Sequence, residues 1–294
     1  MNVRKTSLAA MIAFALVSTT PSFLFASEAA SEAASEAASE GGAPKSTSSA
    51  PTKPDVATAF SIVGASVELS GRHVSYTDLV IENLRTYGVT GAPILRLSAE
   101  LYPLSRLSRA YVLRNLGLGV MYAGALGLSS ALPDATSMST SFHRLEVMLR
   151  LRQPIFKAPG SPVLGAAVGY AHSRFLFDAP DAIQGSVPSV SYHALRFALD
   201  GRVPLGPVAV RGEVGYRMPL AAGALLERFR DGSVGGVDLS VGVAVPIKAG
   251  VEARLGFNYT RYFYSFYPNP GDPYIAGGAL DEYIGFEIGA AHVY

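Results

Sequence analysis

From residue 60 to Tyr294, the sequence repeats one unit: an alternating segment, a long polar loop, a second alternating segment and a short turn rich in Pro and Gly. Each turn ends one alternating run just before the next begins. The four turns are Tyr102-Pro103-Leu104, Gln153-Pro154-Ile155, Val203-Pro204-Leu205-Gly206-Pro207 and Val245-Pro246-Ile247-Lys248-Ala249-Gly250. Short turns on one side and long loops on the other are typical of an up-and-down antiparallel barrel.

The alternating segments are long enough to cross a bilayer as tilted strands. They run approximately over 60–69, 94–103, 111–126, 142–153, 162–175, 191–203, 207–219, 235–246, 250–264 and 280–294. A strand between lipid and a lumen must alternate in this way. A soluble two-sheet sandwich also alternates, but its strands average about five or six residues. Lys is sparse as well, since after residue 53 it occurs only at Lys157 and Lys248. The sequence therefore predicts an all-β transmembrane antiparallel up-and-down barrel of about ten strands.

Residues 70–93 leave the strand number open, because they could contain a further pair of strands. Barrels of roughly eight or twelve strands are the alternatives. An even number puts both termini on one side, and in this class the short turns lie on the periplasmic side. The loops predicted to face outward are 70–93, 127–141, 176–190, 220–234 and 265–279.

The amino-terminal part of the chain predicts export. The run from Leu8 to Val17 follows Arg4 and Lys5 and is too short to span a bilayer, so residues 1–26 are predicted to be a signal peptide cleaved after Ala26. Residues 27–58 repeat Ser-Glu-Ala-Ala and then become rich in Ser and Pro, which predicts a disordered periplasmic linker. The barrel domain is then 59–294. The chain has no Cys, so no disulfide supports it.

The last strand carries a second signal. It alternates and ends on an aromatic residue, with Phe286 and Ile288 on the predicted lipid side and Tyr294 at the end. This strand resembles the assembly signal of bacterial outer-membrane barrels, although His292 stands where that class commonly has an apolar residue. The resemblance implies an outer-membrane location with periplasmic termini. It also implies contact with outer-membrane lipid and lipopolysaccharide, and recognition by the barrel assembly machinery.

Alternation also assigns charged residues to the lumen. The inward Arg residues are Arg96, Arg144, Arg150, Arg152, Arg196, Arg202, Arg211, Arg217 and Arg254. The inward acidic residues are Glu68, Glu100, Glu146, Asp200, Glu213, Asp238, Glu252 and Glu287. Near balance in a narrow lumen favours paired charges and a filled core, because a lone buried charge is costly. An open channel lined by the same charges is the alternative.

Small inward residues on the third and fifth segments are predicted to leave room for the long side chains of the fourth segment. These residues are Asn115, Gly117, Gly119 and Met121 on the third segment, and Gly165, Ala167, Gly169 and Ala171 on the fifth. Aromatic residues near the strand ends are interpreted as girdles at the lipid–water boundary. The group comprises Tyr76, Tyr87, Phe175, Phe177, Tyr259, Tyr262, Phe263, Tyr264, Phe266, Tyr267 and Tyr274. The stiff run from Tyr267 to Tyr274 is the alternative candidate for a binding loop.

Several functions are disfavoured by the sequence. A net charge of +1 gives no electrostatic case for nucleic acid. The five His residues show no metal-ligand spacing, and no glycine-rich stretch precedes a helix, so we expect neither a metal nor a cofactor. His172 and Ser173 are adjacent on a strand and point to opposite faces, so they cannot form a catalytic pair. We expect a structural or interaction protein, with a narrow porin-like channel as the alternative and a barrel protease or lipid-modifying enzyme third.

Overall fold

A computed structural model describes residues 55–79, 84, 86–107, 110–131, 137–158, 160–178, 189–229, 232–269 and 271–294. The strands are β1 (Ser61–Thr77), β2 (Tyr87–Leu101), β3 (Leu116–Ala125), β4 (Ser129–Ala131), β5 (Ser137–Pro154), β6 (Val163–Asp178), β7 (Val190–Leu205), β8 (Val208–Ala221), β9 (Ser233–Lys248), β10 (Val251–Ser265) and β11 (Gly278–Val293), and the helices are α1 (Tyr111–Arg114) and α3 (Ala224–Glu227). The predicted signal peptide, and the predicted linker up to residue 54, lie outside the described residues. Neither described helix is long and apolar enough to cross a membrane.

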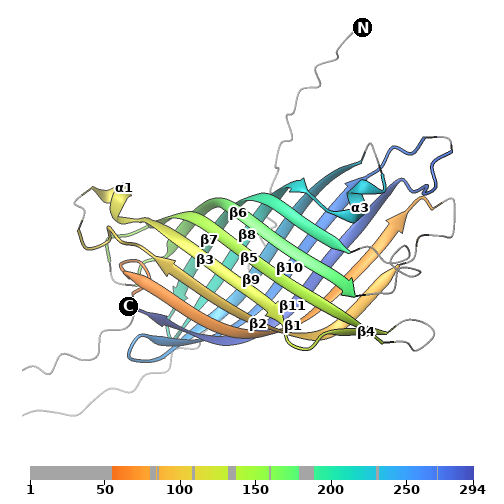
Figure 1. Ribbon diagram of the computed structural model, residues 1–294. Helices are drawn as coiled ribbons and strands as arrows, with labels where there is room; N and C mark the ends of the chain where they lie inside the picture. The colour runs from red at the N-terminus through yellow and green to blue at the C-terminus, as the bar shows by residue number, and fades with distance from the viewer. Residues whose placement is uncertain are drawn as a thin grey trace, which may run out of the picture. The chain divides into compact units, whose positions relative to one another are not determined.

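The strands form one closed antiparallel barrel (Figure 1). Each long strand pairs with its neighbours in sequence, and β1 pairs with β11. The three-residue strand β4 continues the path of β3 along the same partner, β5, so the wall has ten positions. Closure pairs each long strand with a neighbour on both sides, which is what a strand wall in an apolar medium requires. The predicted all-β up-and-down barrel of ten strands is confirmed, and the alternatives of eight and twelve strands are wrong.

The connections divide between two ends of the barrel. We call the end that carries residues 102–115, 155–162, 206–207, 249–250 and Tyr294 the turn end, and the opposite end the loop end. In Figure 1 the carboxyl terminus and α1 lie at one end, and α3 lies at the other. At the turn end, the backbone N–H groups of Phe60 and Ser61 donate to the Tyr294 carbonyl, which holds the two ends of the barrel domain together.

The first predicted loop is too long. Strand β1 continues to Thr77 and β2 begins at Tyr87, so residues 78–86, and not 70–93, connect them. A register shift between Ser70 and Arg72 interrupts the ladder, and pairing then resumes between Arg72 and Val89. The extra residue lies on β2, between Val89 and Ala92, so the bulge reverses the alternation on that strand and not on β1.

The third predicted segment starts too early. Residues Tyr111–Arg114 form the helical turn α1, and β3 begins only at Leu116. The Asn115 amide donates to the Tyr111 carbonyl over 3.1 Å and ends the helical turn. The described part of the connection 102–115 therefore contains a helical turn, whereas the Tyr102-Pro103-Leu104 pattern predicted a short turn.

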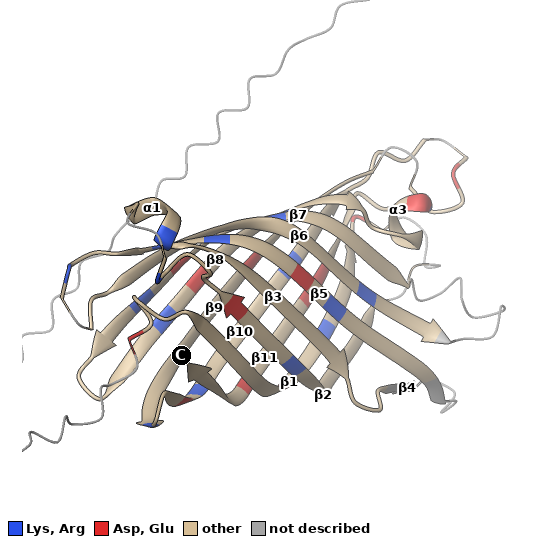
Figure 2. Cartoon of the chain, turned by 60° about the vertical axis from the view of Figure 1, so that its left-hand side comes forward, with Lys and Arg blue, Asp and Glu red and all other residues tan. Residues whose placement is uncertain are grey.

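The outer surface of the barrel is apolar along most of its height. Outward positions carry Leu, Val, Ile and Phe, among them Leu97, Val147, Leu199, Val241 and Ile288, and all five are at least 39% exposed. On the described strands, charged side chains that face outward occur only near the loop end. They are Arg174, Arg261 and Glu282. Most other charges of the wall alternate in sign along the strands, as the blue and red positions in Figure 2 show.

The core lies inside the barrel and has three apolar clusters, the smallest of which is Met148, Ala167 and Ala198. The largest, which we call the loop-end cluster, consists of Val74, Tyr76, Leu84, Ile94, Met121, Ala123, Phe142, Phe175, Phe177, Val190, Tyr192, Ala222, Leu225, Phe229, Tyr262, Tyr264, Phe266, Ala276, Ala279 and Tyr283. A small cluster of Ala59, Ile62, Ala291 and Val293 lies at the turn end. Between the loop-end cluster and the cluster at the turn end, most of the lumen is lined by charged residues.

Candidate functional site

The charged side chains of the lumen are the candidate site, and hairpin geometry sets their order. The two-residue turn 206–207 fixes the register of β7 against β8, so Arg202 faces Arg211, Asp200 faces Glu213, and Arg196 faces Arg217. We call each of these cross-strand pairs a row. Each row brings together two like charges, and like charges directly opposite one another are destabilising. Every row therefore needs opposite charges from the next row or from across the lumen.

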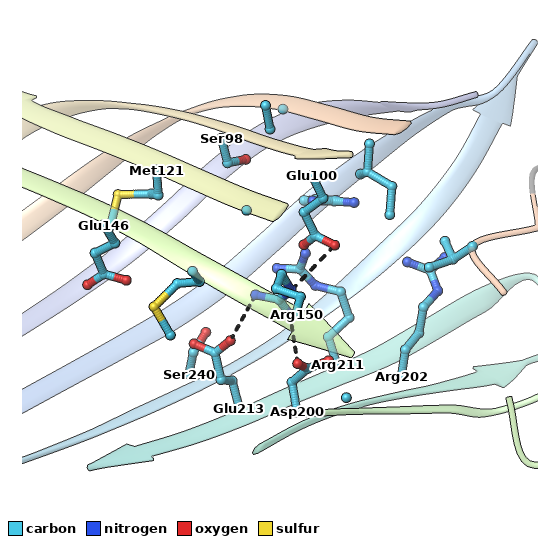
Figure 3. Close-up of a pocket in the computed structure, with 18 of the residues that line it drawn as sticks. Ser98, Glu100, Met121, Glu146, Arg150, Asp200, Arg202, Arg211, Glu213 and Ser240 are labelled. Carbon is cyan, nitrogen blue, oxygen red and sulfur yellow. Dashed lines mark hydrogen bonds and ion pairs between the residues drawn. The ribbon is translucent and has the colours of Figure 1, made fainter. Parts of the chain in front are cut away.

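The acidic row is compensated mainly by Arg150 of β5. Its guanidinium lies 2.7 Å from Asp200, 3.6 Å from Glu100 and 3.8 Å from Glu213, as the dashed lines in Figure 3 show. Arg196 adds a contact of 2.6 Å to Glu213. One guanidinium thus connects β5 with β2, β7 and β8, none of which pairs with β5 in the wall.

The row of Arg196 and Arg217 is compensated by Glu146 and Asp238. Arg217 Nη2 lies 2.6 Å from a Glu146 oxygen, and its Nε lies 2.9 Å from Asp238. Arg196 donates from Nε to Asp238 over 3.2 Å and lies 3.5 Å from Glu146. All four side chains are buried. Paired charges with several hydrogen bonds are the form in which ions are tolerated in such an interior.

Glu252 of β10 holds two Arg residues near the turn end. Arg202 donates to both of its oxygens, over 2.7 and 3.1 Å, and Arg254 Nε donates over 2.8 Å. The Glu252 side chain is fully buried. The two-pronged contact of Arg202 is the arrangement for which the planar guanidinium is suited.

Glu287 of β11 receives Arg96 and Arg211 from opposite sides. Arg96 Nη1 lies 3.1 Å from one Glu287 oxygen and 3.9 Å from Glu68. Arg211 Nη2 lies 3.6 Å from the other Glu287 oxygen, which is too far for a hydrogen bond. Glu68 also accepts a bond of 3.1 Å from the Asn258 amide.

Arg152 bonds to the segment that precedes β1 and has no carboxylate partner among the described residues. It donates to the carbonyls of Val56 and Ala59 over 2.9 and 2.6 Å, and its Cζ lies 3.7 Å from the centre of the Tyr102 ring. Tyr102 donates its hydroxyl to Glu100 over 2.9 Å. Burial, and then the nearby Glu100 carboxylate, raises the pKa of the Tyr102 hydroxyl above its usual range. These contacts fold residues 55–60 against the turn end of the lumen.

Arg144, the remaining predicted residue, lies among aromatic rings. Its Cζ is 5.5 Å from the centre of the Phe142 ring and 5.9 Å from that of Tyr283. Its Nε is buried without a hydrogen-bond partner in the described part of the chain. The structure thus brings the predicted lumen residues together as ion pairs, except Arg144 and Arg152.

Sequence reasoning missed the ion pair closest to the loop end. Arg72 donates to both oxygens of Asp281 over 2.8 and 2.9 Å, and both side chains are almost fully buried. Tyr192 and Tyr283 also donate to this carboxylate, over 2.6 and 3.2 Å. Arg72 was missed because it falls in the predicted loop 70–93. The spacing of four residues from Glu68 is the signal that could have placed it on the inward face.

The aromatic girdle is the largest error of the sequence interpretation. Tyr76, Phe175, Phe177, Tyr262, Tyr264 and Phe266 are buried in the loop-end cluster, and Tyr87 and Tyr274 pack against it. Phe263 and Tyr267 are exposed. Tyr192 and Tyr262 stack with ring centres 3.7 Å apart, and Arg72 Cζ lies 4.3 Å from the centre of the Phe175 ring. The buried rings on the strands lie on the same, inward face as the charged residues, so they fill the lumen.

The small inward residues of β3 and β6 were predicted to leave room for the long side chains of β5, and this holds for only part of them. A Cβ at Gly119 would lie 2.9 Å from Arg150 Cδ, so glycine there makes room for the long side chain of β5. The space at Gly165 is taken by Asp200 of β7, and Gly169 lies against the backbone of β5 and Met148. Gly117 lies against Tyr102. Of these four glycines on β3 and β6, only Gly119 therefore accommodates an Arg side chain of β5.

A cavity of about 200 Å³ lies among these charges, in the half of the lumen nearer the turn end. Figure 3 shows Arg150 at its centre, with Glu100, Asp200, Glu213, Arg202 and Arg211 around it. The wall also includes Val56, Tyr102 and Arg152. The loop-end cluster does not contribute to it, apart from Met121.

Metal binding and catalysis by a Ser–His pair have little support in the described residues. They contain no group of three His, Asp or Glu side chains that could hold a metal ion. Ser173 is buried toward the lumen, whereas His172 of the same strand packs outside against His193, with the rings tilted and their centres 4.4 Å apart. Of the predicted assembly signal, Phe286, Ile288 and Tyr294 are each more than 60% exposed, and His292 lies on the outer face as well.

No protein-family model and no curated protein sequence matches the chain. Among solved structures, it is similar to the translocator domain of the autotransporter NalP from Neisseria meningitidis, at 10% identity and a TM-score of 0.38, over 80% of this chain and 88% of that chain. It is also similar to an outer membrane channel from Pseudomonas putida F1 (11% identity, TM-score 0.41, 86% and 100% covered) and to a Pseudomonas aeruginosa FadL homologue (9%, 0.30, 82% and 92%). The likeness concerns the barrel fold and assigns no activity to this chain.

Proposed function

We propose that this protein is an integral outer-membrane barrel with a structural or interaction role, a lumen that does not conduct, and loops that face the outside of the cell. The observation that carries the proposal is the loop-end cluster. Twenty buried apolar residues from the wall and the loops fill that half of the lumen, and the buried pair Arg72–Asp281 lies among them. A filled lumen leaves the loops and the outer wall as the surfaces available for interaction.

The outer surface supports a membrane location. Apolar side chains cover the outward positions of the strands, and a lipid-facing band of this kind is what separates a membrane barrel from a soluble one. We infer that lipid contacts this band and that lipopolysaccharide surrounds it near the loop end. The exposed Phe286, Ile288 and Tyr294 are candidates for recognition by the barrel assembly machinery.

The orientation, with termini in the periplasm, is tested by thiol labelling, because the chain has no native Cys. Tyr267→Cys places a thiol in the connection between β10 and β11, and Ile247→Cys places one at the turn end; each native side chain is 66% exposed. A membrane-impermeant maleimide added to intact cells should label position 267 only, and both positions after lysis. Labelling of position 247 alone in intact cells would contradict the orientation.

A narrow channel for small solutes is the second candidate, and the cavity of about 200 Å³ favours it. Efflux of a small sugar from proteoliposomes distinguishes the two functions. The proposed closed barrel should release it no faster than protein-free vesicles, and fast release would support the channel.

We propose no catalytic activity, because the lumen carboxylates are engaged with Arg side chains. Turnover of lipid or peptide substrates by the purified protein would contradict this.

A further inference from the structure

Among the described residues, Arg211 is one of three inward Arg side chains, with Arg144 and Arg152, whose Nε is buried without a hydrogen-bond partner. On the ladder between β7 and β8, Arg211 faces Arg202, and two like charges in register repel each other. Arg202 is satisfied by its two bonds to Glu252. Arg211 makes no hydrogen bond within the described residues: its Nη2 is 3.6 Å from Glu287, and its Nε is buried without a partner. A buried donor left without an acceptor is costly.

The surroundings of Arg211 carry more positive than negative charge. Arg96, Arg202, Arg211 and Arg254 share three carboxylates, Glu68, Glu252 and Glu287. Glu100 lines the same cavity and lies 3.6 Å from Arg150. The nearest further carboxylates, Asp200 and Glu213, are already engaged with Arg150 and Arg196. The four Arg side chains exceed the three carboxylates that they share by one charge, which one bound anion could neutralise.

There is room beside Arg211 for such an anion. The inward residues that follow Arg211 across the wall are Gly242 on β9 and Gly256 on β10, and the Glu287 side chain lies over Gly256. The cavity of about 200 Å³ is lined by Arg96, Arg202, Arg211 and Arg254 together. It is several times the ~30 Å³ that a water molecule takes up in the liquid, and a small tetrahedral ion fits within it.

We propose that the turn-end half of the lumen binds a small oxyanion of the phosphate class, held chiefly by Arg211. The Nε and Nη2 groups of one guanidinium form a fork that matches two oxygens of a tetrahedral anion. Arg254 and Arg96 supply further positive charge from β10 and β2. The loop-end cluster closes the opposite half of the lumen, so the ion enters from the turn end. This site does not depend on the proposed membrane role.

The probe for this site is radiolabelled inorganic phosphate, measured by equilibrium dialysis against the full chain in a maltoside detergent at constant chloride concentration. The wild-type protein should show one saturable site. Arg211→Met should weaken binding by about tenfold or more, since it removes a charged two-pronged donor. The matched control is Arg261→Met, which removes an outward Arg from β10 and should leave binding unchanged.

Each outcome decides the proposal. Absence of saturable binding by the wild-type protein overturns it, whatever the variants do. Equal binding by Arg211→Met and wild type also overturns it, as does equal loss in both variants. If Arg211→Met does not fold, Arg211→Lys replaces it; this variant keeps the charge but loses the fork, and it should bind several-fold more weakly than wild type. Displacement of phosphate by a simple carboxylate such as acetate at similar concentration would contradict the preference for a tetrahedral ion.

Discussion

Glu252 offers the sharpest test of the claim that the lumen is held together by charge compensation. Its carboxylate is fully buried and accepts bonds from two Arg residues, over 2.7 and 3.1 Å from Arg202 and 2.8 Å from Arg254. Glu252→Gln keeps the volume but leaves both guanidiniums without a counter-charge. Removing one partner of a buried ion pair costs about 3–5 kcal/mol, which is a shift of more than about a hundredfold in the unfolding equilibrium.

The assay is reversible urea unfolding in small lipid vesicles, followed by gel mobility without boiling. Glu282→Gln is the matched control on β11, because that side chain faces outward, is 25% exposed and lies 3.9 Å from Arg261. Its cost should stay below about 1 kcal/mol. Adding Arg202→Met to Glu252→Gln should restore part of the loss, because it removes one unpaired charge. Equal, small costs for Glu252→Gln and Glu282→Gln would refute the reasoning.

Three further changes test other parts of the interior. Gly215→Val should sharply reduce the folded fraction on gels, because its Cβ would lie 2.6 Å from the Asp238 carboxylate, whereas Gly212→Val on the same strand has open space and should fold normally. Tyr192→Phe removes a hydroxyl that donates to a buried carboxylate over 2.6 Å and should cost about 1–3 kcal/mol in urea unfolding; no cost would argue against the loop-end hydrogen bonds. Burial raises the pKa of Tyr102 above its unfolded value, so stability should fall as pH rises above about 10, and Tyr102→Phe should flatten part of that fall.

The strand number and the inward charges could be predicted because both follow from a local period. Alternation assigns each residue to a face, and a two-residue turn such as 206–207 fixes which residues of a hairpin oppose each other. The rows Arg202–Arg211 and Asp200–Glu213 can therefore be derived from the sequence by counting outward from the turn.

The partners across the lumen could not be predicted in this way. The contact of Arg150 with Asp200 joins strands that are not neighbours, so it depends on the closure and tilt of the whole barrel. The location of the aromatic residues, in contrast, could have been predicted from the alternation of faces. Tyr262 and Phe263 follow each other near the end of β10, yet Tyr262 is buried in the lumen and Phe263 is 40% exposed. Aromatic residues near a strand end are equally compatible with a girdle in the lipid and with a cluster inside the lumen. Only the face of the strand on which each residue lies distinguishes the two.

The most direct test of the closed lumen is electrical. Purified full-length protein is reconstituted into planar lipid bilayers, and insertion is verified by the shift in gel mobility on boiling that a closed barrel shows. Because the loop-end cluster fills one half of the lumen and ion pairs bridge much of the other, the recordings should show no stable conductance steps. Large, stable, ohmic steps from the wild-type protein would contradict a closed lumen.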